Sequence, residues 1–322
     1  MINNKVDAIL ILGRIPPPIG GVTIHVKRLL DAFSGTNITK FCSLSEISSF
    51  HFLKQFLQYR FIHLHTSNPA FRSFLCFFSM LLNKKLIITF HGNIGRYGAF
   101  KNILDKLSIW LCSKPILLNK ESCRKALKLN SRSELLSAFI PPLKTHALPE
   151  NHFKEIQALK SKGINIYCTN AFNVTFDKEG KEIYGITQLL KLFSRIPESR
   201  LVISDPSGQY KNYILKNYPD FKSTPLWISE PHDFFEVLKL SDGFIRNTTT
   251  DGDSLSIKES LFLNVPVYAT DVVDRPHGCF LYKKPDNLFD HFSTKKISVN
   301  PVGKINIESP VKRLEEIYTS YL

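Results

Sequence analysis

The sequence has little cysteine, and its cysteines follow no pattern. Six occur in 322 residues: Cys42, Cys76, Cys112, Cys123, Cys168 and Cys279. None belongs to a C-x-x-C pair, which argues against a cysteine-based zinc site and against a disulfide scaffold. The pattern is instead typical of a chain kept in a reducing compartment.

Long hydrophobic runs are also absent. The most apolar stretch, residues 71–82, is interrupted by Arg72 and is shorter than the roughly 20 residues of a membrane-spanning helix. The first apolar run ends at Gly13 and prolines follow it, which is unlike a secretory signal. With 43% hydrophobic and 22% charged residues, the composition is that of a globular chain, and 322 residues suffice for two domains. We therefore expect a soluble, cytoplasmic, two-domain protein.

Acidic residues are scarce in the first half of the chain. Residues 1–145 hold 20 Lys and Arg against 6 Asp and Glu, whereas residues 146–322 hold 22 of each. The whole net charge of +14 therefore lies in the first half. Such a charge favours an anionic partner (nucleic acid, acidic lipid headgroups or a phosphorylated substrate), although a solubilising surface would look the same. No nucleic-acid-binding module is recognisable, so we expect no nucleic-acid partner.

Short apolar runs alternate with helix-length amphipathic segments throughout. The expected strands are 6–12, 61–65, 86–90, 116–118, 164–168, 200–204, 225–228, 243–246 and 265–269. The expected helices are 23–33, 49–59, 69–83, 100–112, 120–129, 183–195, 233–240, 254–263 and 310–321. This order predicts parallel β-α-β units, and hence an α/β fold of two doubly wound, Rossmann-like domains.

The prolines around residues 141–149 predict a linker between the two domains. We place the first domain at 1–145 and the second at 146–305. The remaining segment, 306–322, is expected to form a C-terminal helix that packs back on the first domain.

Two loops of the first half have the composition of ligand sites. Gly20 and Gly21 precede a helix, where bare backbone and free N–H groups can receive an anion, although a simple turn would also use glycine. The loop contains neither G-x-G-x-x-G nor a P-loop motif. His91 follows a strand and precedes Gly92, a position at which a side chain can contact substrate.

The most informative segment is 244–271. Asp251 lies in the loop after a buried strand, and Glu259 lies in the helix that follows. The two carboxylates therefore bracket a helix N-terminus, where the N–H groups of Ser254, Leu255 and Ser256 could hold a diphosphate. The alternative is that Ser254 only caps the helix and Glu259 is solvated.

This segment resembles the carboxylate motif of retaining glycosyltransferases with the GT-B fold, of the family 4 kind. That motif is E-x7-E, continued as E-A-x-A-x-G-x-P-V-x-A-[ST]-D. Here Asp251 and Glu259 have the same spacing, and residues 259–271 read ESLFLNVPVYATD. The loop 246–253 (RNTTTDGD) resembles a branch with R-P-T-x-T-D-G-D, and the Gly20–Gly21 and His91–Gly92 segments match the family's first half.

The resemblance implies two domains facing a central cleft and a transferase that needs neither metal nor other cofactor. Its donor would be a UDP- or GDP-sugar, and its acceptor a lipid-linked or oligosaccharide glycan in cell-surface polysaccharide, O-antigen or capsule synthesis. It places Glu259 on the ribose, Asp251 and His91 at the sugar as catalytic residues, and Gly20 and Gly21 against the donor. The amides of Ser254, Leu255 and Ser256 would bind the diphosphate.

One feature of that family is missing. Its usual Arg and Lys after the first strand of the donor domain are replaced here by Asn173 and Tyr184. A diphosphate site needs cations, because charge-assisted hydrogen bonds are the strong ones. Arg246 is the preferred replacement and a further catalytic candidate, with Lys181 as a donor-binding candidate; the other possible replacements are Lys178 and Arg275.

The basic half has a second interpretation. Residues 50–59 and 71–85 interleave aromatic side chains with Lys and Arg, which favours peripheral attachment to the inner, anionic face of a membrane. The same aromatic residues could also simply form helix core. Two other functions stay open: a non-catalytic GT-B subunit that binds a sugar nucleotide or a partner, and a GT-B epimerase or phosphorylase.

Overall fold

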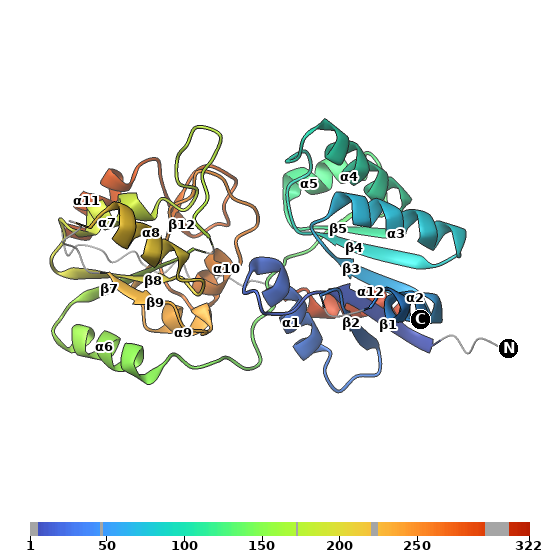
Figure 1. The fold of residues 1–322 in the computed structure, drawn as a ribbon, viewed down its shortest axis with the longest axis horizontal. Helices are drawn as coiled ribbons and strands as arrows, with labels where there is room; N and C mark the ends of the chain where they lie inside the picture. Colours follow the sequence, from blue (N-terminus) through green and yellow to red (C-terminus); the bar gives the residue numbers. More distant parts are fainter. Residues whose placement is uncertain (1–5, 46–47, 172, 220–224, 294–308) are drawn as a thin grey trace. The chain divides into compact units, whose positions relative to one another are not determined.

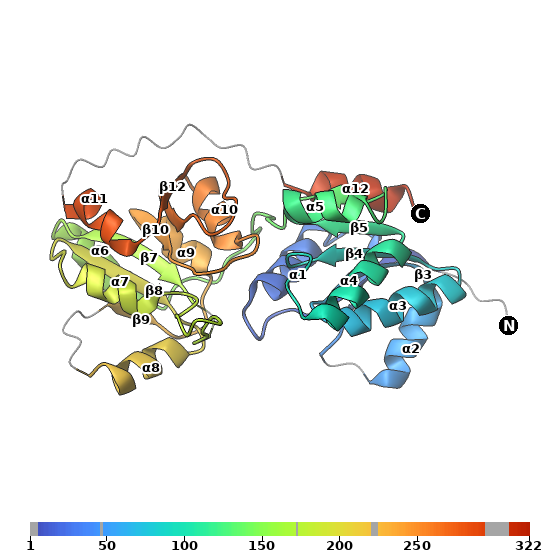
Figure 2. The same ribbon diagram turned by 90° about the horizontal axis from the view of Figure 1, so that it is seen from above.

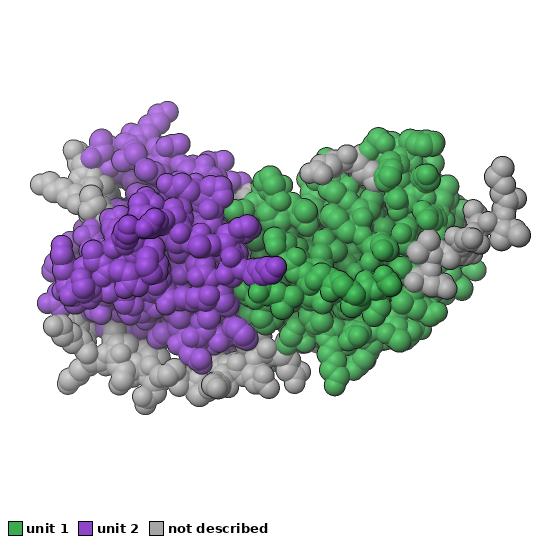
Figure 3. Space-filling view, turned by 90° about the horizontal axis from the view of Figure 1, so that it is seen from below, with its two compact units in different colours: residues 1–143, 308–322 green, residues 144–307 purple. Residues whose placement is uncertain are grey.

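The computed structural model describes residues 6–45, 48–171, 173–219, 225–293 and 309–322. The chain divides into two compact units, shown in different colours in Figure 3. Unit 1 comprises residues 1–143 and 308–322, and unit 2 comprises residues 144–307.

Unit 1 is built on a six-stranded parallel sheet with the order β2-β1-β3-β4-β5-β6 (Figure 1). The strands are β1 (Val6–Gly13), β2 (Thr39–Ser43), β3 (Tyr59–His65), β4 (Lys85–Phe90), β5 (Lys114–Leu117) and β6 (Glu134–Leu135). The helices are α1 (Gly21–Ala32), α2 (Ser49–Gln58), α3 (Pro69–Leu81), α4 (Ala99–Leu111), α5 (Lys120–Leu127) and α12 (Val311–Thr319). The chain order reverses beside β1, and in such sheets ligands bind at the carboxyl ends of the strands near this reversal.

Helices cover both faces of this sheet. Leu10 and Leu12 of β1 point into a core shared with α2, α3, α4 and α5, whereas Ile9 and Ile11 point into a core on the opposite face. Burial on both faces is why β1 is a continuous apolar run and not an alternating one.

The C-terminal helix belongs to unit 1. Leu314, Ile317 and Tyr318 of α12 pack with α1 in the core on the second face of the sheet. The Tyr318 hydroxyl lies 2.6 Å from Nδ1 of His63 on β3, a contact that ties the end of the chain to the middle of the sheet.

Unit 2 repeats this architecture. Its parallel sheet has the order β12-β11-β10-β7-β8-β9. The strands are β7 (Asn165–Asn170), β8 (Ser199–Ser204), β9 (Leu226–Ile228), β10 (Gly243–Arg246), β11 (Val267–Thr270) and β12 (Cys279–Tyr282). The helices are α6 (Glu150–Ser161), α7 (Ile186–Phe193), α8 (Gln209–Asn217), α9 (Phe234–Lys239), α10 (Leu255–Phe262), the 3-10 helix η1 (Pro285–Leu288) and α11 (Phe289–Ser293). The two parallel sheets confirm the predicted α/β class with two Rossmann-like domains.

The predicted strands and helices are all present, but the sequence prediction omitted several elements. The strand β2 is an edge strand in which only Cys42 is fully buried, so it carries little apolar signal. The helix α8 buries only Tyr210 and Ile214, and α6 buries only His152 and Ile156, so neither shows a wide apolar stripe. β6, β12, η1 and α11, of two to five residues each, are too short for a periodic signal.

The cysteines and the apolar helices were also the subject of predictions. All six cysteines are free thiols, in agreement with the predicted absence of a disulfide scaffold. Within the described ranges, none of the helices combines the length and the apolar character required to cross a bilayer.

Candidate functional site

In unit 2, the candidate residues lie at the carboxyl edge of the sheet. Arg246 ends β10, Asn170 ends β7 and Thr270 ends β11, and these three strands are neighbours. Because parallel strands end on the same edge, residues separated by up to 100 positions meet there. The loop that follows β10 leads directly into α10.

Asp251 is held by two arginines in that loop. Arg246 donates to it in a bidentate manner, from Nε to Oδ2 and from Nη2 to Oδ1, both at 2.9 Å. Nη1 of Arg275 donates to Oδ2 at 2.7 Å, and the Gly252 amide donates to Oδ1 at 3.0 Å. The roughly four lone-pair positions of a carboxylate are thus all used by protein donors.

Burial and charge act in opposite directions on this carboxyl group, whose side chain is 7% exposed. Burial alone would raise the pKa of Asp251, but the charges and hydrogen bonds of Arg246 and Arg275 outweigh it and lower the pKa to about 2. Asp251 is therefore ionised and neutralised. With two guanidinium groups and one carboxylate, the cluster carries a net charge of +1.

Arg275 was only a possible replacement cation in the sequence prediction, and the structure makes it a full member of this cluster. Its side chain is 2% exposed. Nε donates to the Thr270 carbonyl at 3.1 Å, and Nη2 donates to the Thr248 hydroxyl at 3.2 Å. The signal that could have found it is its position in the loop after β11, next to the loop after β10.

Arg246 also connects the cluster to the start of α10. Nη1 donates to Oδ1 of Asn170 at 3.3 Å, and the Asn170 amide donates to the Ser256 hydroxyl at 2.7 Å. The Arg246 guanidinium carbon lies 5.3 Å from the ring centroid of Tyr184. Tyr184, which stands where the family has a lysine, therefore contacts Arg246, the preferred replacement for that lysine.

The N-terminus of α10 has the features of an anion site. Ser254 caps the helix by accepting a hydrogen bond from the Ile257 amide at 3.5 Å. The first turn of any helix leaves N–H groups without an intrahelical partner, here those of Leu255 and Ser256 among others. Glu259 lies one turn further on the buried side of the helix and is 4% exposed. Both predicted carboxylates are thus buried.

Lys181 lies in a different environment. It ends an exposed turn in which the amides of Glu179 and Lys181 donate to Oδ1 of Asp177 at 2.9 and 3.0 Å. Its ammonium group pairs with Glu179 at 2.6 Å, and both side chains are well exposed. The structure therefore places Lys181 in a solvent-exposed ion pair, unlike the buried Arg246 and Arg275.

In unit 1, Gly20 precedes α1 with an extended backbone. The Gly20 amide donates to the Thr23 hydroxyl at 3.0 Å, and that hydroxyl in turn donates to the Pro18 carbonyl at 2.7 Å. A Cβ added at Gly20 would have only Oγ1 of Thr23 within 4 Å, at 3.9 Å. The protein itself therefore leaves room for a side chain at Gly20. Gly21, the first residue of α1, is exposed.

His91 follows β4 and lies among other histidines. Its Nε2 lies 3.1 Å from Nδ1 of His65, the last residue of β3. Burial above all, and then neighbouring positive groups (His25 first), hold the pKa of His91 well below its usual value, so the ring is neutral. An added Cβ at Gly92 would overlap the side chain of Arg96, so this glycine lets the guanidinium lie against the backbone beside His91.

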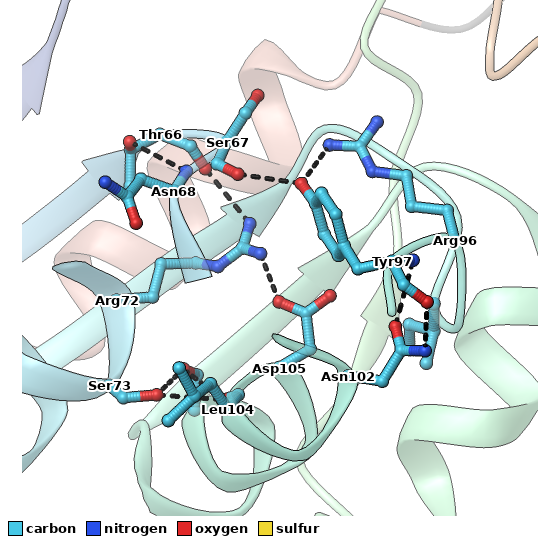
Figure 4. Close-up of polar contacts among 12 residues, drawn as sticks. Thr66, Ser67, Asn68, Arg72, Ser73, Arg96, Tyr97, Asn102, Leu104 and Asp105 are labelled. Atoms are coloured by element: carbon cyan, nitrogen blue, oxygen red, sulfur yellow. Dashed lines mark hydrogen bonds and ion pairs between the residues drawn. The ribbon is translucent and has the colours of Figure 1, made fainter. Parts of the chain in front are cut away.

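A polar cluster fixes the loop after His91 (Figure 4). Arg72 and Asp105 form a buried ion pair, and Nη1 of Arg72 donates to the Thr66 carbonyl at 3.0 Å. The Tyr97 hydroxyl donates to the Ser67 carbonyl at 2.7 Å and accepts from Nη2 of Arg96 at 2.5 Å. These contacts tie the loop after β4 to the loop after β3.

The predicted residues thus form two groups. Arg246, Asp251, Ser254, Leu255, Ser256 and Glu259 lie together in unit 2, and Gly20, Gly21 and His91 lie at the ends of α1 and β4 in unit 1. The sequence prediction missed the role of Asn170 and the histidines around His91. These neighbours come from separate strands and helices, so only the sheet order reveals them.

No protein-family model matches the sequence, and no curated protein matches it. Solved structures with the same fold exist, however. HepE from Anabaena, solved with UDP and glucose, is 11% identical and has a TM-score of 0.69, with 97% of this chain and 100% of that chain covered. Sucrose-phosphate synthase from Thermosynechococcus elongatus is 13% identical with a TM-score of 0.67, covering 98% and 99%.

A third similar structure is WaaG, a glycosyltransferase involved in lipopolysaccharide biosynthesis. It is 10% identical and has a TM-score of 0.54, with 97% of this chain and 94% of that chain covered. Identities this low show the fold and not the activity. These structures are GT-B glycosyltransferases, and this chain has the GT-B fold.

Proposed function

We propose that the chain is a retaining, metal-independent glycosyltransferase that uses a UDP- or GDP-sugar. The observation that carries this proposal is the buried Arg246–Asp251–Arg275 cluster beside the N-terminus of α10, with Glu259 one turn along the same helix. Two fixed cations and free helix amides at the carboxyl edge of a parallel sheet suit a nucleoside diphosphate.

The charges indicate how the donor would react. Departure of the nucleoside diphosphate builds negative charge on its outer phosphate, and Arg246, Arg275 and the Ser254–Ser256 amides can stabilise that charge without a metal ion. Glu259 would accept hydrogen bonds from the ribose hydroxyls. Because protein donors already saturate Asp251, its proposed role is to hold both arginines in place; direct contact with the sugar would require it to give up one of these bonds.

Unit 1 would supply the remaining contacts. A neutral His91 can exchange hydrogen bonds with a sugar hydroxyl without adding charge to the site. At Gly20 the protein leaves space for a Cβ, and a donor phosphate lying close to the backbone there would explain why no side chain is present. To bind the donor, the exposed ammonium group of Lys181 would have to break its ion pair with Glu179.

The acceptor is proposed to be a lipid-linked or oligosaccharide glycan of cell-surface polysaccharide, O-antigen or capsule synthesis. The similarity to WaaG supports this class, as does the positive charge of the first half of the chain, which suits a diphosphate-linked glycan. The proposed location is the cytoplasm, at the inner face of the membrane.

The donor proposal is tested by thermal melting with UDP-, GDP- and ADP-sugars. One nucleotide family should raise the melting temperature, and Glu259→Gln should remove that shift. Glu155→Gln, an exposed carboxylate on α6, is the matched control and should keep it. A folded protein that responds to none of these donors would contradict the proposal. Donor binding without release of nucleoside diphosphate, with every acceptor class tried, would instead favour the non-catalytic alternative.

A large apolar surface on unit 1 supports membrane attachment. The helices α3 and α4 lie side by side on one face of the sheet (Figures 1 and 2). Their exposed apolar side chains are Phe74, Phe77, Phe78, Met80, Leu81, Phe100, Ile103, Leu107 and Trp110. Exposed Lys101 and Lys106 lie on α4 among them. A soluble surface rarely gathers so many large apolar groups, and cationic residues among them suit anionic lipid.

The sequence prediction assigned the aromatics of 50–59 and of 71–85 to this role and omitted α4. Some side chains of α3 form helix core and others are available to a membrane. Phe71 and Leu75 pack in the core, whereas Phe74 and Phe77 are exposed. We expect the double variant Phe77→Ser/Trp110→Ser to lose sedimentation with anionic vesicles. Leu215→Ser, an equally exposed residue on α8 of unit 2, should keep it. Unchanged sedimentation of the double variant would exclude this surface.

A further inference from the structure

Three histidines from three elements of unit 1 meet beside the proposed donor contact. His25 lies on α1, His65 ends β3 and His91 follows β4. Their ring centroids lie 5.1 to 5.3 Å apart, and each ring has a nitrogen within 4.8 Å of a nitrogen of the other two. We propose that these three imidazoles bind a divalent transition-metal ion, Zn²⁺ in the first place, and that the bound ion withdraws His91 from the sugar donor.

The hydrogen bonds of His25 fix its tautomer. Nδ1 lies 2.7 Å from the backbone carbonyl of Ala138. A carbonyl can only accept, so Nδ1 carries the proton and Nε2 carries the lone pair of the neutral ring. A histidine whose Nδ1–H is oriented by a backbone carbonyl is the usual arrangement of a metal ligand, because that bond sets the ring and raises its basicity.

His65 and His91 already have nearly the spacing of two ligands. Their facing nitrogens, Nδ1 of His65 and Nε2 of His91, are 3.1 Å apart. In a tetrahedral site with Zn–N of about 2.0–2.1 Å, ligand nitrogens are about 3.3 Å apart. The ion would take the place of the proton between these two nitrogens, and that proton would move to the outer nitrogen of the ring that donates it. The widest of the three pairs would close by about 1 to 1.5 Å through side-chain rotation.

The other nitrogen of His65 would not bind the ion. His65 is 1% exposed, and within the described residues its Nε2 is buried without a hydrogen-bond partner. With the ion on Nδ1, Nε2 would carry the proton of the neutral ring, so this atom is not itself a ligand and the site rests on the geometry of the three rings. By contrast, the neighbouring His63 uses both nitrogens, with the Tyr318 and Thr89 hydroxyls at 2.6 and 2.8 Å.

The charge state favours coordination, and the surroundings limit its strength. Burial, followed by the neighbouring histidines, holds the pKa of His65 well below its usual value, and the neutral imidazole is the form that binds metal. Arg72 and Arg96 lie close enough to act on His91, and their charge opposes a cation, although Asp105 pairs with Arg72. We therefore expect micromolar affinity and not the tighter binding of a structural zinc site.

Three nitrogen ligands and an open fourth position form the arrangement of an exchangeable site, and imidazole suits Zn²⁺ and Cu²⁺. The sequence could not show it, because positions 25, 65 and 91 have no motif spacing. Metal binding itself is independent of the proposed function; only the loss of His91 to the donor rests on it.

Calorimetric titration of the full chain with Zn²⁺ tests the site. We expect one ion per chain with micromolar affinity, and at least tenfold weaker binding by His25→Gln and by His91→Gln. His51→Gln, an exposed histidine on α2, should bind as the wild type does. Binding that is not saturable, or site variants that bind as tightly as the wild type, would overturn the proposal.

X-ray absorption of the zinc-loaded wild type provides a test that requires no variant to fold. Three imidazole nitrogens on the ion support the site, and one or none contradicts it. In the transfer assay, Zn²⁺ should inhibit and a chelator should restore activity. Stoichiometric binding without inhibition would overturn the inhibitory part alone, whereas a chain without transferase activity would leave the binding result intact.

Discussion

At the scale of single residues, the saturation of Asp251 sets what this carboxylate can do. Arg246 approaches it from the end of β10 and Arg275 from the loop after β11, and without it their two charges would face each other in a buried site. Removal of one partner from a buried ion pair typically costs about 3–5 kcal/mol, because the remaining charge is left uncompensated. Asp251 therefore acts on stability as well as on the site.

We expect Asp251→Asn to lower the free energy of unfolding of unit 2 by about 3 kcal/mol, because the amide group meets guanidinium donors with a donor of its own. The double variant Asp251→Asn/Arg275→Met removes one cation and should recover part of that loss without recovering donor binding. Urea unfolding of the wild type and both variants measures the effect. If the double variant is no more stable than the single one, repulsion between Arg246 and Arg275 does not cause the loss of stability.

The ion pairs of Asp251 with Arg246 and Arg275 also predict that the stability of the chain depends on pH. The pKa of Asp251 is about 2 in the folded chain and 3.8 in its ordinary state. A lowered folded-state pKa gives stability that is present above pH 3.8 and is lost as the pH falls towards 2. The difference in unfolding free energy between wild type and Asp251→Asn should therefore shrink by about 2 kcal/mol between pH 4 and pH 2. A difference that stays constant over this range would show that folding does not lower the pKa of Asp251.

At the scale of secondary-structure elements, the C-terminal helix completes unit 1. Leu314 of α12 is buried with Ile9 and Ile11 of the first strand, about 300 residues away in the sequence. Its neighbour Glu315 is exposed. The sheet face beneath α12 is apolar, so the unit depends on the last turns of the chain to keep this face from water.

We expect Leu314→Ala to lower the free energy of unfolding of unit 1 by about 2–5 kcal/mol, because it removes a buried side chain and leaves a void. Glu315→Ala, one position along the same helix, should change it by less than about 0.5 kcal/mol. Chemical denaturation, with hydrogen exchange in β1 as a second measurement, gives the effect of each substitution. Equal effects of the two substitutions would mean that α12 is not docked on the sheet in solution.

The helices and strands also show which features can be predicted from the sequence alone. The apolar run of β1 and the helix-length apolar segments of α3 and α10 predicted these elements to within two residues at each end. Their own side chains determine which positions are buried. The motif around Asp251 predicted that a charged loop precedes a helix. It could not predict that Arg275 would bind Asp251 from the next loop, or that His25 and His65 would surround His91. Those contacts depend on which strands are neighbours, and a single sequence does not contain that order.

At the scale of the whole molecule, charge and chemistry are separated along the chain. The whole excess of 14 positive charges lies in residues 1–145, whereas the arginine cluster lies in the second half of the chain, where acidic and basic residues balance. Exposed charges are screened by salt over about 8 Å at physiological ionic strength, and buried pairs are screened much less. Membrane attachment and donor binding should therefore respond differently to salt.

We expect an increase in ionic strength from about 0.05 to about 0.5 M to abolish sedimentation with anionic vesicles, because the attraction arises from exposed lysines and arginines. The melting-temperature shift produced by the favoured nucleotide sugar should fall by less than half over the same range, because Arg246 and Arg275 are 12% and 2% exposed. Neutral vesicles provide the control, since attachment that ignores lipid charge would trace to the apolar face of α3 and α4 alone. If donor binding and vesicle binding instead decline in parallel with salt, exposed charge and not the buried cluster holds the donor, and the assignment of the donor site to unit 2 fails.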